Sequence, residues 1–136
     1  MAVDRARAER AVREFLLAFG REPEHEADLR GTPARVVEAY AKDLLSGYDV
    51  DVKALLAEGE AISESQVSGL VALSGIAVST VCPHHLLLSN GVASVVYRPG
   101  SRLFGLGTLA ALVNAFARRL SLQESIGESV VQALVE

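Results

Sequence analysis

The hydrophobic residues near the N-terminus recur with the spacing of an amphipathic helix. Four of them stand at positions i, i+3, i+4 and i+7, with Arg and Glu between them: Val12, Phe15, Leu16 and Phe19. This period matches one face of an α-helix. The pattern therefore predicts a helix over residues 5–19, and Gly20 follows in the place of a C-terminal cap.

A second helix is predicted after a polar stretch that has no periodicity. The pair Thr32-Pro33 combines a capping hydroxyl with a proline at the first helical position. The helix should continue to about Ser46, before Gly47, on an apolar face of Val36, Val37, Tyr40 and Leu44. Residues 51–57 add a short helical piece, and the polar residues 58–66 read as a linker.

From residue 67 the pattern changes from helical to β-like. The stretches 67–80 and 91–98 are rich in β-branched residues, and Pro99-Gly100 closes the second of them. They predict antiparallel strands joined through a loop that contains Cys82. Because a ribbon of two strands is marginally stable in water, neighbouring subunits or strands beyond residue 136 should complete the sheet.

Helical spacing returns after these strands. One helix is predicted from a Thr108 cap, and its apolar positions are Leu109, Leu112, Val113 and Phe116. Another follows the Gln123-Glu124 pair, with apolar positions at Ile126, Val130 and Leu134. The order of helices and strands predicts an α+β fold.

Composition excludes several classes of function. The chain of 136 residues has 13 Lys and Arg against 17 Asp and Glu, a net charge of −4, and no Trp, which argues against a nucleic-acid partner. No uncharged apolar run approaches the ~18 residues of a membrane span. A single cysteine, Cys82, cannot form an internal disulfide, so we expect a cytoplasmic protein.

The segment VCPHH is the part of the sequence richest in reactive side chains. Residues three apart in a turn can converge, so Cys82 and His85 could bind one metal ion, while His84 would face elsewhere and be free to move protons. Zinc suits a thiolate with an imidazole. The alternative is a small buried cysteine beside two surface histidines.

Gln123 and Glu124 form a second candidate site. An amide beside a carboxylate fits the donor and acceptor edge of a purine, although such pairs are also common at helix starts as caps. Arg118 and Arg119 read as a solvated helix end that complements the helix dipole.

These motifs together resemble the GTP cyclohydrolase I family. TPARVVEAYAKDLLSGY resembles its TP-x-R helix, VCPHHLLL its Cys-x-His-His loop, and GVASVVYRPGSRLFGLGTLAALVNAFARRLSLQES its strand, Gly-Leu turn, helix and Gln-Glu segment. The resemblance implies the tunnelling fold, an antiparallel sheet backed by helices that assembles into a homo-oligomeric barrel with active sites between subunits. Residues 1–66 would be an N-terminal helical region, and residues 67–136 part of the tunnelling-fold catalytic domain.

The resemblance also implies the reaction and the residues that serve it. The family uses zinc for the hydrolytic opening of the guanine imidazole ring of GTP, which yields formate and dihydroneopterin triphosphate for pterin and folate biosynthesis. By position, Cys82 and His85 resemble the zinc ligands and His84 the proton-transfer histidine. Gln123 and Glu124 resemble the guanine-binding pair. Arg35, in the TP-x-R helix, would contact an anion.

The sequence departs from the family at the positions associated with the triphosphate. Ser-Lys and a following Arg are replaced by Gly107, Thr108 and Ala111, and the motif's Glu is replaced by Pro83. The family's second zinc-binding cysteine lies in strands beyond Glu136. Two alternatives therefore stay open: a catalytically impaired paralogue that acts as a binding subunit, and a tunnelling-fold enzyme acting on a purine or pterin without a triphosphate.

Overall fold

The chain divides into two compact units. A computed structural model describes residues 2–63 and 69–135, and its compact units span residues 1–46 and 47–136. The division lies before the boundary at residue 66 that the sequence suggested. The first residues of the predicted strand 67–80 lie outside the described residues, as do positions 64–66 of the predicted linker.

The first unit begins with the predicted amphipathic helix, α1 (Arg5–Ala18). The Asp4 carboxylate caps its start by accepting a hydrogen bond from the Arg7 backbone N–H at 3.0 Å. At its end Gly20 has a φ of +70°, and the backbone N–H groups of Gly20 and Arg21 donate to the carbonyls of Leu17 and Leu16. This is a Schellman motif, which confirms the capping role predicted for Gly20.

The second helix, α2 (Thr32–Ala39), starts differently from the prediction. Gly31 is the N-cap, with a φ of +74°, so the prediction of Thr32 as the cap is wrong. A left-handed residue before the helix turns the chain so that Thr32 already has helical geometry. A short 3-10 segment, Ala27–Leu29, precedes α2, and a π-helical turn, Tyr40–Leu44, continues it. Val37 is buried, and Arg5 forms an ion pair with Glu38.

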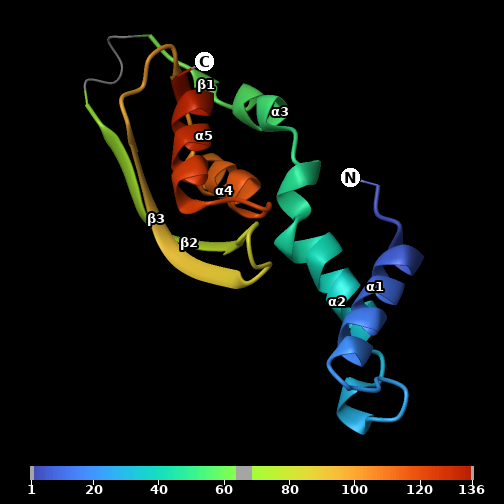
Figure 1. Cartoon of the computed structure of the whole chain (residues 1–136). Helices are drawn as coiled ribbons and strands as arrows, with labels where there is room; N and C mark the ends of the chain where they lie inside the picture. The colour runs from blue at the N-terminus through green and yellow to red at the C-terminus, as the bar shows by residue number, and fades with distance from the viewer. Residues whose placement is uncertain (1, 64–68, 136) are drawn as a thin grey trace. The chain divides into compact units, whose positions relative to one another are not determined.

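The second unit contains a long hairpin and three helices. A 3-10 turn (Ser46–Asp49) leads into α3 (Val52–Ala57), followed by strands β1 (Glu60–Ala61), β2 (Val71–Val81), β3 (Leu88–Tyr97) and β4 (Arg102–Leu103), and by helices α4 (Leu106–Ala117) and α5 (Gln123–Val135). Figure 1 shows β2 and β3 as a curved ribbon that bends around α4 and α5. The antiparallel strands and the helices confirm the α+β class.

The hairpin pairs β2 with β3 in one antiparallel register, from Val71 opposite Tyr97 to Val81 opposite Leu88. A bulge places Ser74 and Gly75 opposite Ser94, and Gly75 takes a φ of +78°. Among the described strands no other element pairs with this ribbon. The two-stranded sheet that the sequence predicted is therefore confirmed, and its β3 side exposes Val92 and Val96 to 74% and 60%.

Two local predictions in this unit are wrong. Part of the expected polar linker is a strand, because Glu60 and Ala61 of β1 pair with β4. The predicted Thr108 cap lies inside the first turn of α4, whose N-cap is Gly105. Apolar Leu106 thus belongs to the helix, which begins two residues before Thr108.

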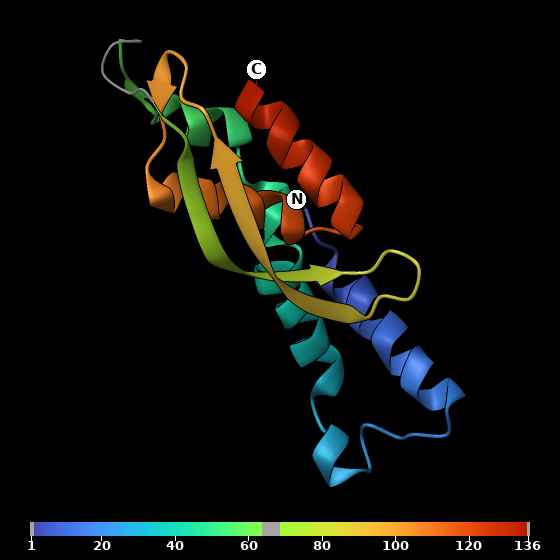
Figure 2. The same cartoon turned by 90° about the vertical axis from the view of Figure 1, so that its left-hand side faces the viewer.

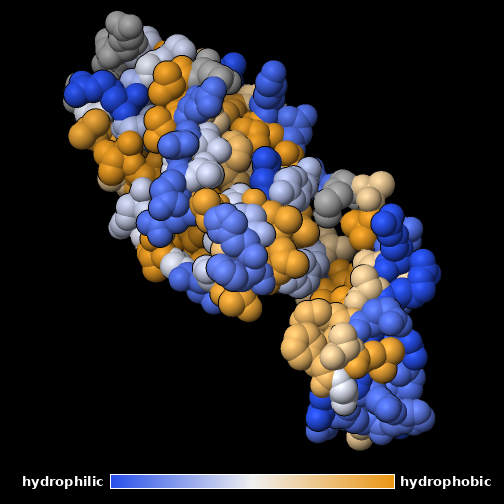
Figure 3. All heavy atoms as spheres, in the orientation of Figure 1, coloured by the Kyte–Doolittle hydropathy of each residue, from blue (hydrophilic) through white to orange (hydrophobic). Residues whose placement is uncertain are grey.

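The core of the second unit lies between the hairpin and the two C-terminal helices. Its buried members come from β2, β3, α4 and α5: Ile76, Val95, Leu109, Leu112, Val113 and Val130. α4 contributes half of them, more than any other element. The surface carries charged and hydrophobic side chains side by side (Figure 3). Among the described residues, no helix is long and apolar enough to cross a membrane.

Candidate metal and purine site

The loop between β2 and β3 carries the Cys-Pro-His-His motif. Two backbone hydrogen bonds close it: Cys82 N–H donates to the Leu87 carbonyl at 2.9 Å, and Leu86 N–H donates to the Cys82 carbonyl at 2.8 Å. Leu86 takes a φ of +56°, the left-handed region that leucine rarely adopts. Figure 2 shows this loop, in yellow, at the far end of the hairpin. The backbone path therefore folds residues 82–87 into a compact turn.

The turn brings Cys82 and His85 together. Their Sγ and Nδ1 atoms are 3.8 Å apart. Two ligands of a tetrahedral zinc ion, with sulfur at about 2.3 Å and nitrogen at about 2.0 Å, lie about 3.5 Å from each other. The observed separation is close to that value, so this donor pair fits one edge of a zinc coordination sphere.

The same turn lowers the pKa of the Cys82 thiol below its ordinary value. The largest cause is the hydrogen bond with the His85 side chain, followed by hydrogen bonds from the backbone N–H groups of His84 and His85. Each of them stabilises the thiolate, which is the form of cysteine that binds a metal ion.

His84 lies beside His85 in the same loop. Its ring lies 6.2 Å from the ring of His85, with the two planes at 80° to each other, and its side chain is exposed. An imidazole in this position is open to a ligand and to water.

The described residues supply two protein donors for a metal ion at this point. Within 2–63 and 69–135, no three His, Cys, Asp or Glu side chains gather into a group that could hold a metal ion. Catalytic zinc sites usually have three protein ligands. The chemistry of Cys82 and His85 fits zinc.

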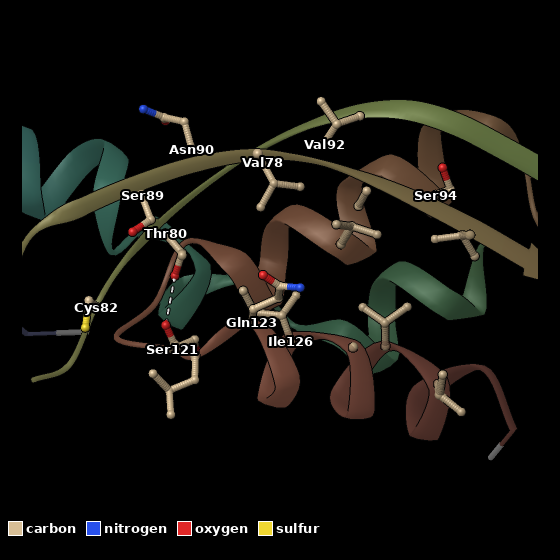
Figure 4. A pocket seen from close by; sticks show the side chains of 18 of the residues that line it. Val78, Thr80, Cys82, Ser89, Asn90, Val92, Ser94, Ser121, Gln123 and Ile126 are labelled. Atoms are coloured by element: carbon tan, nitrogen blue, oxygen red, sulfur yellow. Dashed lines mark hydrogen bonds between the residues drawn. The ribbon is translucent and has the colours of Figure 1, made fainter.

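A groove runs from Cys82 along the hairpin to α5. It has a volume of about 660 Å³, and Figure 4 shows the side chains that line it. Cys82 and Ser89 lie at one end, and Gln123 projects into the space between the ribbon and the helix. The described lining residues include no charged side chain.

Gln123 and Glu124 occupy the first turn of α5, as the sequence predicted. Gln123 lines the groove, while Glu124 is exposed beside it. The first turn of α5, with Gln123 and Glu124, therefore lies near the Cys82 loop, because the residues just before α5 pair with the end of β2. There the Ser121 backbone N–H donates to the Val81 carbonyl at 3.2 Å.

Arg35 lies in the first unit and has local partners. Its guanidinium donates to the Arg30 carbonyl at 2.8 Å and to the Thr32 hydroxyl at 2.9 Å. These bonds hold the turn that starts α2. Both partners are neutral oxygens, and the side chain is exposed.

Arg119 differs from the solvated helix end that the sequence suggested. Its Nε–H donates to the carbonyl oxygens of Ala115 at 2.7 Å and Gly47 at 3.1 Å, and its guanidinium lies over the ring of Phe116. The side chain thus joins the end of α4 to the Gly47 turn. Sequence reasoning missed this role because Gly47 is 72 residues away, and only the adjacent Arg-Arg pair marked the position.

The positions expected to carry triphosphate-binding cations lie in the first turns of α4. Gly107, Thr108 and Ala111 supply no charge there, and none of them lines the groove.

Comparison with known proteins shows which family this chain resembles. The family described as GTP cyclohydrolase I matches residues 8–136. The chain is 37% identical to a GTP cyclohydrolase 1 of Hyperthermus butylicus, over 98% of this chain and 65% of that protein. It is 39% identical to one of Mycobacterium ulcerans, over 99% and 65%, and 40% identical to one of Ralstonia nicotianae, over 98% and 62%. The chain thus spans slightly less than two thirds of the length of these relatives.

Proposed function

Because the chain belongs to the GTP cyclohydrolase I family, we propose that it takes part in the zinc-dependent hydrolytic opening of the guanine imidazole ring of GTP. The products would be formate and dihydroneopterin triphosphate. One observation carries the proposal: the Cys82 Sγ and His85 Nδ1 atoms lie 3.8 Å apart, in a loop whose strand pairs with the chain leading to Gln123 and Glu124.

In this proposal Cys82 and His85 are protein ligands of the zinc ion. Zinc, when bound, makes water a nucleophile near neutral pH. The His84 ring, exposed beside His85, would donate a proton to the purine ring during opening and take one back afterwards.

Gln123 and Glu124 would bind the guanine base. The amide can donate and accept, and the carboxylate accepts from the N–H groups of the base edge. Their place at the first turn of α5 holds both side chains on one rigid element beside the groove. Arg35 would contact the anionic end of the ligand, and in that complex it would exchange its neutral oxygen partners for charged ones.

We place this site in a tunnelling-fold homo-oligomer in the cytoplasm, with active sites between subunits. The exposed β3 side of the two-stranded ribbon supports an assembly, because such a ribbon is marginal in water without further strands.

The test is formate release from GTP by the zinc-loaded chain and by His84→Ala. Removing a general acid and base should lower the rate by about a hundredfold or more, while zinc content stays unchanged. His25→Ala is the matched control, since His25 is an exposed histidine of the first unit, and it should keep the parent rate. A His84→Ala protein that releases formate at the parent rate would remove His84 from its role.

A parent chain that binds zinc and purine but releases no formate would favour the impaired binding subunit instead. A second candidate substrate has an observation of its own. The described lining of the groove carries no charge, and Gly107, Thr108 and Ala111 add none, which favours a purine or pterin without a triphosphate.

A further inference from the structure

The hydroxyl of Thr80 joins the two halves of the proposed site. Its Oγ1 donates to the Ser121 carbonyl at 3.3 Å and lies 3.4 Å from the Arg119 carbonyl, an arrangement of one donor shared between two acceptors. These partners are 41 and 39 residues away in sequence. Figure 4 shows the bond from Thr80 to Ser121 between the ribbon and the chain that enters α5.

Backbone contacts beside Thr80 form part of the same connection. Val81 is fully buried and makes an isolated parallel bridge with Leu120. The Ser121 N–H donates to the Val81 carbonyl at 3.2 Å. The Thr80 hydroxyl therefore adds a side-chain bond to a short stretch of strand-like pairing, and the pairing ends one residue before Cys82.

The far side of this connecting chain is anchored as well. Besides its bonds to two carbonyls, Arg119 lies 5.5 Å from the centre of the Tyr48 ring, and the Tyr48 hydroxyl accepts from the Leu120 N–H at 3.3 Å. These contacts fix one side of residues 119–122. The conformational freedom that remains to this segment is therefore limited by its hydrogen bonds with the end of β2.

We propose that Thr80 is a positioning residue that sets the start of α5 relative to the Cys82 loop. Cys82 stands two residues after Thr80, and Gln123 stands two residues after Ser121, so a bond between Thr80 and Ser121 fixes both groups through short pieces of chain. This inference rests on the proposed function: the bond would hold the purine-binding side chains in register with the metal-binding pair. A misplacement of about 1 Å at a reacting centre costs about a hundredfold in rate.

The experiment compares Thr80→Val, Thr80→Ser and Ser79→Ala in the full chain. Valine keeps the shape of threonine and removes its hydroxyl, while serine keeps the hydroxyl. Ser79 is the matched control, because it is the neighbouring hydroxyl and bonds to Asn90 across the hairpin at 2.7 Å instead of to residues 119–121. Amide hydrogen exchange is measured without ligand, with guanosine affinity and the formate-release rate as further readouts.

We expect Thr80→Val to speed amide exchange about fivefold in both 82–87 and 119–122, as loss of one hydrogen bond predicts. Guanosine affinity should stay within about twofold, because Gln123 and Glu124 are intact, while kcat falls about tenfold or more. Thr80→Ser should keep all three readouts near the parent values, and Ser79→Ala should leave the exchange of 119–122 unchanged.

Unchanged exchange in Thr80→Val, or an equal effect in Ser79→Ala, would overturn the inference. If Thr80→Val does not fold, Thr80→Ser provides the test through the same exchange measurement. Exchange rates more than about twofold above the parent in both segments would then show that the hydroxyl does not set the exchange rates of 82–87 and 119–122. A parent chain that binds no guanosine overturns the proposed function and leaves nothing to position. The exchange data distinguish failure of the proposed function from failure of the positioning role of Thr80, because amide exchange is measured without ligand.

Discussion

At the scale of single residues, the geometry of the Cys82 loop depends on one strained backbone position. Leu86 adopts a φ of +56° so that its N–H can reach the Cys82 carbonyl and its neighbour Leu87 can accept from Cys82. For a residue with a Cβ atom this conformation costs about 1–2 kcal/mol. The strain persists because the register of β2 and β3 on either side fixes the ends of the loop.

Leu86→Gly should therefore stabilise the protein. Glycine removes the left-handed penalty but costs about 0.5–1 kcal/mol through the freedom of the unfolded chain, which leaves a net gain of about 0.5–1 kcal/mol. Little burial is lost, because Leu86 is 54% exposed. Urea unfolding, with the midpoint compared at constant slope, measures the change.

Leu87→Gly is the matched control. Leu87 is 67% exposed and lies in the same loop, but its φ is not positive, so glycine there brings only the entropic cost. We expect it to destabilise the protein by about 0.5–1 kcal/mol. A Leu86→Gly protein less stable than the parent would show that the side chain matters more to this loop than its backbone strain.

Spacing alone predicted that Cys82 and His85 would meet, because residues three apart in a turn converge whatever surrounds them. The roles of Thr80 and Arg119 could not be predicted in this way. Each depends on partners 39 to 72 residues distant, and a single hydroxyl or guanidinium in a sequence carries no record of such pairing.

At the scale of elements, the helices were predicted more reliably than their first residues. Periodicity located α1, α2, α4 and α5, since burial of one face repeats along the whole helix. The caps at Thr32 and Thr108 were wrong because glycines precede both helices, Gly31 with a left-handed φ and Gly105 with an extended one. Capping by a hydroxyl is a preference of about 1 kcal/mol, which such backbone geometry overrides.

The contact between the end of α4 and the turn at Gly47 requires a glycine, because there is no space for a side chain at this position. A Cβ atom at Gly47 would lie 2.4 Å from the Ala115 carbonyl oxygen and 2.7 Å from that of Arg118. Both are backbone atoms that cannot move aside cheaply. Gly47→Ala should therefore destabilise the second unit by about 2–3 kcal/mol, measured by urea or thermal unfolding.

Gly127→Ala provides the contrast for that prediction. Gly127 lies within α5, and a Cβ atom there meets nothing within 4 Å. Alanine should raise stability by about 0.5–1 kcal/mol through its better helix propensity. If the two substitutions had equal effects, the close approach at Gly47 would not govern the packing of this turn.

At the scale of the whole molecule, the net charge and the two-stranded sheet affect which ligands and partners the chain can bind. The net charge is −4, and the described residues that line the groove include no Asp, Glu, Lys or Arg. The sequence predicted the incomplete sheet because two β-branched runs are too few for a stable sheet. It could not predict the groove, since its walls come from segments that meet only after β2 and α5 pack together.

The neutral groove leads us to expect that the triphosphate adds little to affinity. Guanosine should bind within about tenfold of GTP, because each missing charge-assisted contact is worth about 1.5–3 kcal/mol. Raising salt from about 50 to about 500 mM should change guanosine affinity less than about twofold, since a neutral base contact is not screened. Isothermal titration calorimetry measures both.

Glu124→Ala is the control for specific binding and should abolish guanosine affinity. A preference for GTP of about a hundredfold or more, weakened steeply by salt, would go against this expectation. It would indicate that further cations besides Arg35 reach the phosphates.

The most direct test of the account is the zinc content of the purified chain, measured by elemental mass spectrometry together with the intact mass. We expect about one zinc ion per chain, lost in Cys82→Ser and in His85→Ala and retained in His84→Ala, because Cys82 and His85 are the two donors that converge. A parent chain without zinc, or a Cys82→Ser chain with full zinc content, would contradict the assignment of this loop as a metal site.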